Sequence, residues 1–251
     1  MNVTVSGRLD GVRLLVTGGA RGIGRAVLEV ASREGASVVF FDVEEAAGRQ
    51  TAAETGAEFH RVDITDEGAI AAAVERIGPL GVLVNNAGRN AYFDPVEMTQ
   101  DEWDEVFAVD LKGAWLVAKH VLPAMKTARA GSIVNVASIH GRLTTNNFFP
   151  YAAAKSGLIG LTRSMAIDLG PFGIRVNAVS PGYTRTHLVE EWLSMQPPGA
   201  EEAVLQAHPL RRIGTPTEIA EVICFLASDA ASFVSGADWA IDGALSVRFA
   251  G

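Results

Sequence analysis

Residues 12–24 read VRLLVTGGARGIG, and this stretch decides the fold. An apolar run typical of a buried strand passes directly into a glycine-rich turn, and a helical pattern follows. Glycines let a backbone turn tightly and approach a pyrophosphate, while the N-terminus of the next helix offers free N–H groups. The stretch therefore predicts a strand–turn–helix unit that holds the phosphates of a nucleotide.

The spacing of these glycines narrows the kind of nucleotide site. No Gly-Lys-Ser/Thr follows the turn, so a P-loop for a nucleoside triphosphate is excluded. The strict dinucleotide pattern G-x-G-x-x-G is also not met, because Val27 stands in the third glycine position. The place between a strand and a helix still favours dinucleotide binding over a purely structural turn. The expected cofactor contacts here are Gly18, Arg21, Gly22, Ile23 and Gly24.

The alternation of apolar runs and helical stretches continues along the whole chain. We expect strands at 12–17, 37–42, 57–63, 80–85, 132–137, 174–179 and 237–241. Helices are expected at 22–34, 44–55, 67–77, 101–126, 151–169 and 217–228. Nearly continuous apolar strands are typical of a parallel sheet with helices on both faces. The pattern predicts one doubly wound α/β domain over 1–251, with ligands bound at the carboxyl ends of the strands.

Composition excludes several classes of protein. The 251 residues carry 21 basic and 29 acidic side chains, a net charge of −8, and nucleic-acid binding needs a basic surface instead. The single cysteine, Cys224, forms no internal disulfide and fits a reducing compartment. No apolar run approaches membrane-spanning length, and residues 1–10 lack the basic and apolar regions of a signal peptide. We expect a cytoplasmic protein with no nucleic-acid or membrane partner.

Two adjacent prolines, Pro197 and Pro198, interrupt an otherwise helical stretch at 186–207. An insertion at this place would lie above the carboxyl edge of the sheet. The segment at about 183–212 is therefore either a lid over the substrate or an ordinary surface excursion.

Asp42 ends the second expected strand, 18 residues beyond Gly24. A carboxylate there can accept hydrogen bonds from the ribose hydroxyls of adenosine. It would also repel a 2′-phosphate, at a cost on the order of 1–4 kcal/mol. Arg21 could meet that phosphate, but Val43 adds no second cation beside Asp42. The balance predicts NAD over NADP as the cofactor.

The third and fourth strands end in further cofactor candidates. Asp63 could bond the exocyclic amine of adenine, although Thr65 and Asp66 beside it could equally cap a helix. The Asn-Asn-Ala-Gly sequence at 85–88 would let the backbone pass close to a cofactor, and it also fits a buried turn. The residues expected to contact the cofactor from these ends are Asp63, Ile64, Asn86, Ala87 and Gly88.

Ser138, Tyr151 and Lys155 form the candidate catalytic set. Tyr151 and Lys155 are four residues apart and share one face of a helix, and Ser138 ends the fifth strand. A phenol has an ordinary pKa of about 10, and a nearby ammonium with an oxidised nicotinamide would lower that pKa. Tyr151 would then serve as general base for an alcohol and general acid for a carbonyl. A Y-x-x-x-K pattern alone also fits a solvated helix face, but here it accompanies a nucleotide loop.

Together these motifs resemble the short-chain dehydrogenase/reductase family over essentially the whole chain. The resemblance rests on residues 17–24, 85–88, 151–155 and 181–182, with Asp42 and Ser138. It implies a Rossmann-type fold with a seven-stranded parallel sheet, a nicotinamide cofactor and hydride transfer. It further implies that Tyr151 lies at the cofactor and that Lys155 bonds the nicotinamide ribose. Contacts to the nicotinamide carboxamide are implied for the loop residues Pro181, Gly182, Thr184 and Thr186.

One position departs from the family pattern. The family usually has asparagine in a stretch like V-N-L-K-G, where it holds a water relay as a fourth catalytic member. Here residues 109–113 read VDLKG, so Asp110 stands at that place. Asp110 could still accept from a water, but its charge would stabilise the Lys155 ammonium and oppose the Tyr151 phenolate. We expect Asp110 to be a relay residue that carries a negative charge where the family usually has a neutral amide.

Polar residues near the expected nicotinamide site suit a hydroxyl-rich small molecule. The expected substrate contacts are His140, Asn147, Tyr183, Arg185 and Trp192. Segments 138–141, 147–151 and 192–197 are similar to family members that oxidise the anomeric carbon of a free aldose to a lactone. The alternatives are a reductase of 3-oxoacyl thioesters, which would usually favour NADP, and a protein that binds NAD without turnover. No zinc or hydrolase motif is present, and we expect no catalytic metal.

The expected helix at 101–126 is apolar around much of its circumference. A single apolar stripe would serve the sheet, so the wider coverage predicts a second buried face. The resemblance implies a homotetramer with this helix and the helix that begins at Tyr151 at an interface. Burial beneath the lid within one subunit is the alternative.

Overall fold

A computed structural model describes residues 7–248, so the expectations for residues 1–6 and for 249–251 lie outside the described part of the chain. A parallel seven-stranded sheet forms its centre, in the order β3-β2-β1-β4-β5-β6-β7. The strands are β1 (Arg13–Thr17), β2 (Ser37–Asp42), β3 (Glu58–Arg61), β4 (Val82–Asn85), β5 (Gly131–Val136), β6 (Ile174–Pro181) and β7 (Asp238–Ile241). The predicted doubly wound, Rossmann-type sheet is confirmed.

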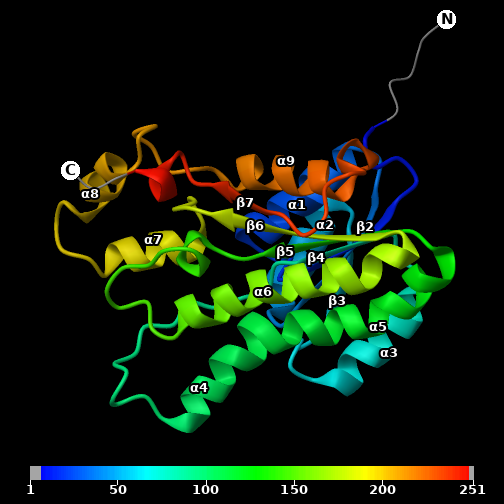
Figure 1. The fold of residues 1–251 in the computed structure, drawn as a ribbon, viewed down its shortest axis with the longest axis horizontal. Helices are drawn as coiled ribbons and strands as arrows, with labels where there is room; N and C mark the ends of the chain where they lie inside the picture. The colour runs from blue at the N-terminus through cyan, green and yellow to red at the C-terminus, as the bar shows by residue number, and fades with distance from the viewer. Residues whose placement is uncertain (1–6, 249–251) are drawn as a thin grey trace, which may run out of the picture.

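Helices cover both faces of this sheet, as Figure 1 shows. One layer holds α1 (Gly22–Arg33), α2 (Glu45–Thr55) and α9 (Pro216–Ala227). The other holds α3 (Glu67–Ile77), α5 (Gly113–Ala128) and α6 (Tyr151–Leu169), with α4 (Gln100–Phe107) leading into α5. Within β1, Leu14 and Val16 pack in the first layer and Leu15 in the second, because successive side chains of a strand point to opposite faces.

The stretch expected as one helix at 101–126 is helical from Gln100 to Ala128, but it is not α-helical throughout. A five-residue π-helical turn, η1 (Ala108–Lys112), separates α4 from α5. Such turns widen the helical hydrogen-bond pattern and are frequent at functional sites. Asp110 lies in this turn and is buried. The irregularity therefore coincides with the residue that departs from the family pattern.

The stretch at 186–207 divides at the two prolines, as predicted. It forms α7 (His187–Ser194) and α8 (Ala200–Ala207). The side chain of Thr186 caps α7 by accepting from the backbone N–H of Val189. Asp66 likewise caps α3 by accepting from the N–H of Ala69, which is one of the two roles considered for this region.

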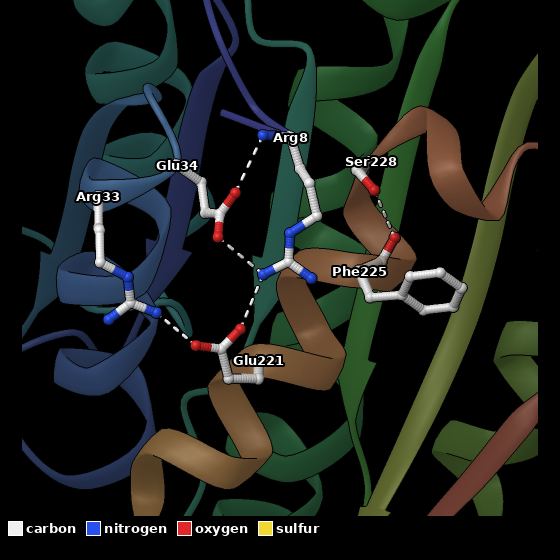
Figure 2. A network of polar contacts seen from close by, with 6 residues as sticks. All are labelled: Arg8, Arg33, Glu34, Glu221, Phe225 and Ser228. Carbon is white, nitrogen blue, oxygen red and sulfur yellow. Dashed lines mark hydrogen bonds and ion pairs between the residues drawn. The ribbon is translucent and has the colours of Figure 1, made fainter. Parts of the chain in front are cut away.

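A network of ion pairs ties the start of the described chain to the α1–α9 layer (Figure 2). Arg8 Nη2 lies 2.9 Å from Glu34 Oε1 and 2.7 Å from Glu221 Oε2, and Arg33 also pairs with Glu221. Hydrogen bonds from Arg8 lower the pKa of Glu34 to about 2. The network fastens the C-terminal end of α1 to α9, and so supports the helix whose other end meets the glycine loop.

Within residues 7–248, no helix combines the length and apolar character that a membrane crossing requires.

Candidate functional site

A cavity of about 690 Å³ opens at the carboxyl ends of the strands. It brings together nearly every residue predicted to bind the cofactor or to catalyse. From the glycine loop and the first strands these are Gly18, Arg21, Gly22, Ile23, Asp42, Asp63, Ile64, Asn86, Ala87 and Gly88. From the later elements they are Asp110, Ser138, Tyr151, Lys155, Pro181, Gly182, Thr184 and Thr186. Gly24 is the predicted cofactor residue that does not line the cavity.

Gly24 serves the packing beneath the loop instead. A Cβ at this position would lie 2.0 Å from the carbonyl oxygen of Gly18 and 2.6 Å from Nδ2 of Asn86. Gly18 itself has a φ of +67°, a conformation that favours glycine. Asn86 holds the loop through hydrogen bonds from Nδ2 to the carbonyl oxygens of Thr17 at 3.0 Å and Gly18 at 2.9 Å. The glycines therefore allow the loop, α1 and the end of β4 to approach closely.

The N-terminus of α1 fits the pyrophosphate of a dinucleotide. No side chain caps this helix, and its first turn carries no acidic residue. Gly22 and Ile23, the first two residues of α1, line the cavity. An uncapped helix N-terminus carries partial positive charge and free N–H groups, which favour an anion. The donor set present is that expected for a dinucleotide.

Asp42 lies at the rim where β2 ends. Its Oδ2 accepts from the N–H of Ala20 at 2.9 Å, and its Oδ1 accepts from the N–H of Glu44 at 3.0 Å. These backbone donors fix the carboxylate at the cavity. Glu44 also lines the cavity and pairs with Arg21, a contact that sequence reasoning missed. A second acid two residues beyond Asp42 was the signal that could have suggested it.

Ser138, Tyr151 and Lys155 converge at the opposite end of the cavity. Ser138 follows β5, and Tyr151 is the first residue of α6, with Lys155 one turn further on. Nζ of Lys155 lies 5.5 Å from the centroid of the Tyr151 ring and donates to the carbonyl oxygen of Val136 at 3.3 Å. The strand end and the first turn of the helix thus place a hydroxyl, a phenol and an ammonium together.

Burial raises the pKa of Tyr151 above its ordinary value, and the charge of Asp110 adds to that effect. Lys155 and a hydrogen bond from Ser138 act in the opposite direction and lower the pKa of Tyr151. In the protein alone, the effect of burial on the pKa of Tyr151 outweighs that of Lys155, so the phenol is neutral at neutral pH.

Asp110 contacts Lys155 directly. Nζ of Lys155 lies 3.1 Å from Oδ1 of Asp110, and both side chains are buried. Oδ1 of Asp110 also accepts from the backbone N–H of Arg89 at 3.2 Å. Burial opposes the ammonium of Lys155, yet the charges of Asp110 and Tyr151 raise its pKa above the ordinary value. A buried, charged lysine–aspartate pair is therefore built into the site.

The five predicted substrate residues lie around the cavity without lining it. Arg185 is engaged by Glu190 at 2.8 Å and Glu201 at 2.6 Å. Tyr183 and Trp192 pack against each other, with ring centroids 5.5 Å apart. Asn147 is exposed and also does not line the cavity.

His140 takes a different place, in a group of aromatic rings at Tyr151. It stacks on Phe148 with ring centroids 3.8 Å apart and meets the Tyr151 ring edge-on at 6.0 Å. Tyr92 packs edge-on against Phe148 at 5.3 Å. Burial lowers the pKa of His140 to about 4, which keeps the imidazole neutral. Sequence reasoning noticed Phe148 in a segment but did not assign Tyr92 or Phe148 to the site, since their meeting depends on a bridge between Tyr92 and Pro150.

Among residues 7–248, no group of three or more histidine, cysteine or acidic side chains is arranged to hold a metal ion.

Comparison with known proteins covers the chain almost from end to end. Residues 18–246 match a family model described as enoyl-(acyl carrier protein) reductase. The chain is 41% identical to a trans-4-hydroxycyclohexanecarboxylate dehydrogenase of Sinomonas cyclohexanicum, over 95% of this chain and 94% of that protein. It is 40% identical to a 3-oxoacyl-(acyl-carrier-protein) reductase of Thermotoga maritima, over 96% and 100%. The solved structure of an aldohexose dehydrogenase from Thermoplasma acidophilum has a TM-score of 0.88 and 34% identity, and 96% of each chain is covered.

Proposed function

The chain belongs to the short-chain dehydrogenase/reductase family, and from this membership we propose that it oxidises a ring-borne hydroxyl with NAD, using Tyr151 as general base. Family membership alone gives the reaction class: the protein is an oxidoreductase for secondary alcohols or ketones with a nicotinamide cofactor. The meeting of Ser138, Tyr151 and Lys155 in one cavity with the glycine loop carries the proposal. A protein that binds NAD without turnover would not need this set.

In the proposed mechanism the protein moves a proton at the phenolic oxygen of Tyr151. The nicotinamide, when bound, accepts or donates the hydride. Ser138 donates a hydrogen bond to the substrate oxygen and holds it beside Tyr151. Lys155 favours the phenolate by its charge and offers its ammonium to the nicotinamide ribose. In the reverse direction Tyr151 gives the proton back to the carbonyl oxygen as general acid.

NAD rather than NADP is the proposed cofactor. Asp42 stands fixed at the rim by two backbone donors, where a carboxylate binds ribose hydroxyls and repels a 2′-phosphate. Arg21, which could meet such a phosphate, is paired with Glu44. Both features support NAD.

We favour an aldose as the substrate, oxidised at C1 to its lactone. Aromatic rings of His140, Phe148 and Tyr92 gather beside Tyr151, and such aromatic surroundings fit the apolar C–H groups of a pyranose. The similarity to an aldohexose dehydrogenase supports this choice. A second candidate is an alicyclic alcohol, because the predicted polar contacts Arg185 and Asn147 do not line the cavity and a relative acts on a hydroxycyclohexanecarboxylate. Reduction of a 3-oxoacyl thioester is the third, supported by the acyl-carrier-protein reductase relative.

A substrate panel tests this proposal. The protein is mixed with NAD at alkaline pH and with D- and L-aldoses, cis- and trans-4-hydroxycyclohexanecarboxylate, and a 3-hydroxyacyl thioester, and NADH is followed by absorbance. We expect turnover of one stereochemical set of aldoses. Turnover of the cyclohexane acids alone would make an alicyclic alcohol the substrate in place of an aldose. Turnover of the thioester alone would indicate a 3-oxoacyl-thioester reductase. NAD binding with no turnover on any of them would contradict the ring-alcohol proposal.

We further propose a cytoplasmic homotetramer in which α7 and α8 serve as a lid over the substrate. Trp103 on α4 and Trp115 on α5 are 37% and 43% exposed, and Ile167 on α6 is 77% exposed. These apolar surfaces are not covered within the described subunit, which supports burial against another copy over burial beneath the lid. We expect light scattering to give four times the subunit mass of 26.5 kDa, and a monomer would contradict the assembly.

A further inference from the structure

Glu44 and Arg21 form an ion pair at the rim of the cavity, beside Asp42. Oε2 of Glu44 accepts from Nε of Arg21 at 3.2 Å and from Nη2 at 3.1 Å. The two side chains are 55% and 54% exposed, and both residues line the cavity. Arg21, the cation at the Asp42 end of the cavity, is therefore already paired with the carboxylate of Glu44.

The other cations near the cavity are engaged elsewhere. Arg61, which lies beside Asp42 in the β2–β3 register, does not line the cavity and faces Glu45 at 3.9 Å. Arg89 and Lys155 line the cavity but pair with Glu105 and with Asp110. Arg21 is thus the guanidinium placed to meet a phosphate on the ribose that Asp42 would bind.

We infer that Glu44 is a second specificity-determining residue, which excludes NADP by neutralising Arg21. A ribose 2′-phosphate is accommodated in dinucleotide sites by a nearby arginine. To use Arg21, such a phosphate must displace Glu44 and still lie beside the charge of Asp42. An exposed ion pair contributes little to stability. Glu44 acts here because its carboxylate compensates the Arg21 charge that the phosphate would need. The inference rests on the proposed NAD site.

The two carboxylates are joined by the backbone and act on one phosphate position. The N–H of Glu44 donates to Oδ1 of Asp42 at 3.0 Å, so the turn that fixes one carboxylate also places the other. Removing Asp42 alone leaves Arg21 paired with Glu44. Removing the charge of Glu44 alone frees Arg21 but leaves the repulsion from Asp42. The two substitutions together should therefore improve NADP binding by more than the product of the single effects.

Calorimetric binding of NAD and of NADP tests this without any substrate. The proteins compared are the wild type, Asp42→Asn, Glu44→Gln, the double variant, and the double variant with Arg21→Gln added. We expect Glu44→Gln to lower the ratio of Kd for NADP to Kd for NAD by roughly tenfold, and the double variant to lower it further. Adding Arg21→Gln should remove most of the gain. Glu75→Gln is the matched control, because Glu75 is an exposed carboxylate on α3 and does not line the cavity.

Each outcome separates the inference from the proposed function. A wild type that binds neither nucleotide, or that prefers NADP, overturns the proposed NAD site itself. A wild type that prefers NAD, with an unchanged ratio in Glu44→Gln, overturns the inference alone. An equal gain from Glu75→Gln would also overturn it, since a general loss of negative charge would then explain the effect. If the double variant fails to fold, the single variant and its control still decide the question.

Discussion

Tyr151→Phe is expected to lower kcat by roughly 10²–10⁴-fold on whichever alcohol the panel identifies, because the protein loses its general acid–base group. In the proposed mechanism, the phenol is the group that exchanges a proton with the substrate oxygen. The ring remains, so its packing against His140 and its place at the start of α6 are kept. The measurement is steady-state turnover of the substrate with NAD, from neutral to alkaline pH.

The control for this variant is nucleotide binding. Since the phenolic hydroxyl is removed without disturbing the glycine loop, the Kd for NAD should stay within a few-fold of the wild type. Ser138→Ala should also lower kcat, by less, because it orients the substrate oxygen but transfers no proton. Tyr151→Phe with turnover near that of the wild type would exclude the proposed base, whatever the substrate.

Much of the fold follows from local patterns in the chain. The alternation of apolar strands and helices predicts all seven strands with ends displaced by only a few residues, because both faces of a parallel sheet must be apolar. The interruption of the helix by η1 could not be predicted in this way. Residues 108–112 read AVDLK, a sequence compatible with a regular helix. In the structure Asp110 lies in this turn and pairs with Lys155, a contact between segments far apart in the sequence.

The site residues likewise fall into those that local sequence indicates and those that depend on contacts between separate segments. Glycines, strand-end acids and the Y-x-x-x-K spacing are local signals, and the structure places them around one cavity. The aromatic group and the Glu44–Arg21 pair arise between separate segments of the chain, and the acid two residues beyond Asp42 was the local sign of the second contact alone. Arg185, a donor near the nicotinamide loop, remains a predicted substrate contact. Its ion pairs with acids from α7 and α8 could not be predicted from the local sequence.

Asp110→Asn is expected to shift the pH profile of oxidation to lower pH and to destabilise the protein. The negative charge of Asp110 raises the pKa of Tyr151, so its removal lets the phenolate form at lower pH. Asparagine keeps the shape and an acceptor for Lys155, but the buried ammonium loses its counter-charge. Breaking a buried ion pair in this way costs about 3 kcal/mol of unfolding free energy, less whatever the amide oxygen restores. The measurements are kcat against pH and urea unfolding.

The stability difference should itself depend on pH. The pKa of Lys155 is raised in the folded protein, so the ion pair contributes its full stabilisation below 10.5, the ordinary value for lysine. That contribution is lost as the pH rises through the raised pKa, and there the variant and the wild type should converge. Asp104→Asn is the matched control, because Asp104 is an exposed carboxylate on the neighbouring α4 and does not line the cavity. An unchanged pH profile in Asp110→Asn would show that Asp110 neither relays a proton nor sets the charge at Tyr151, and would leave it a structural partner of Lys155 alone.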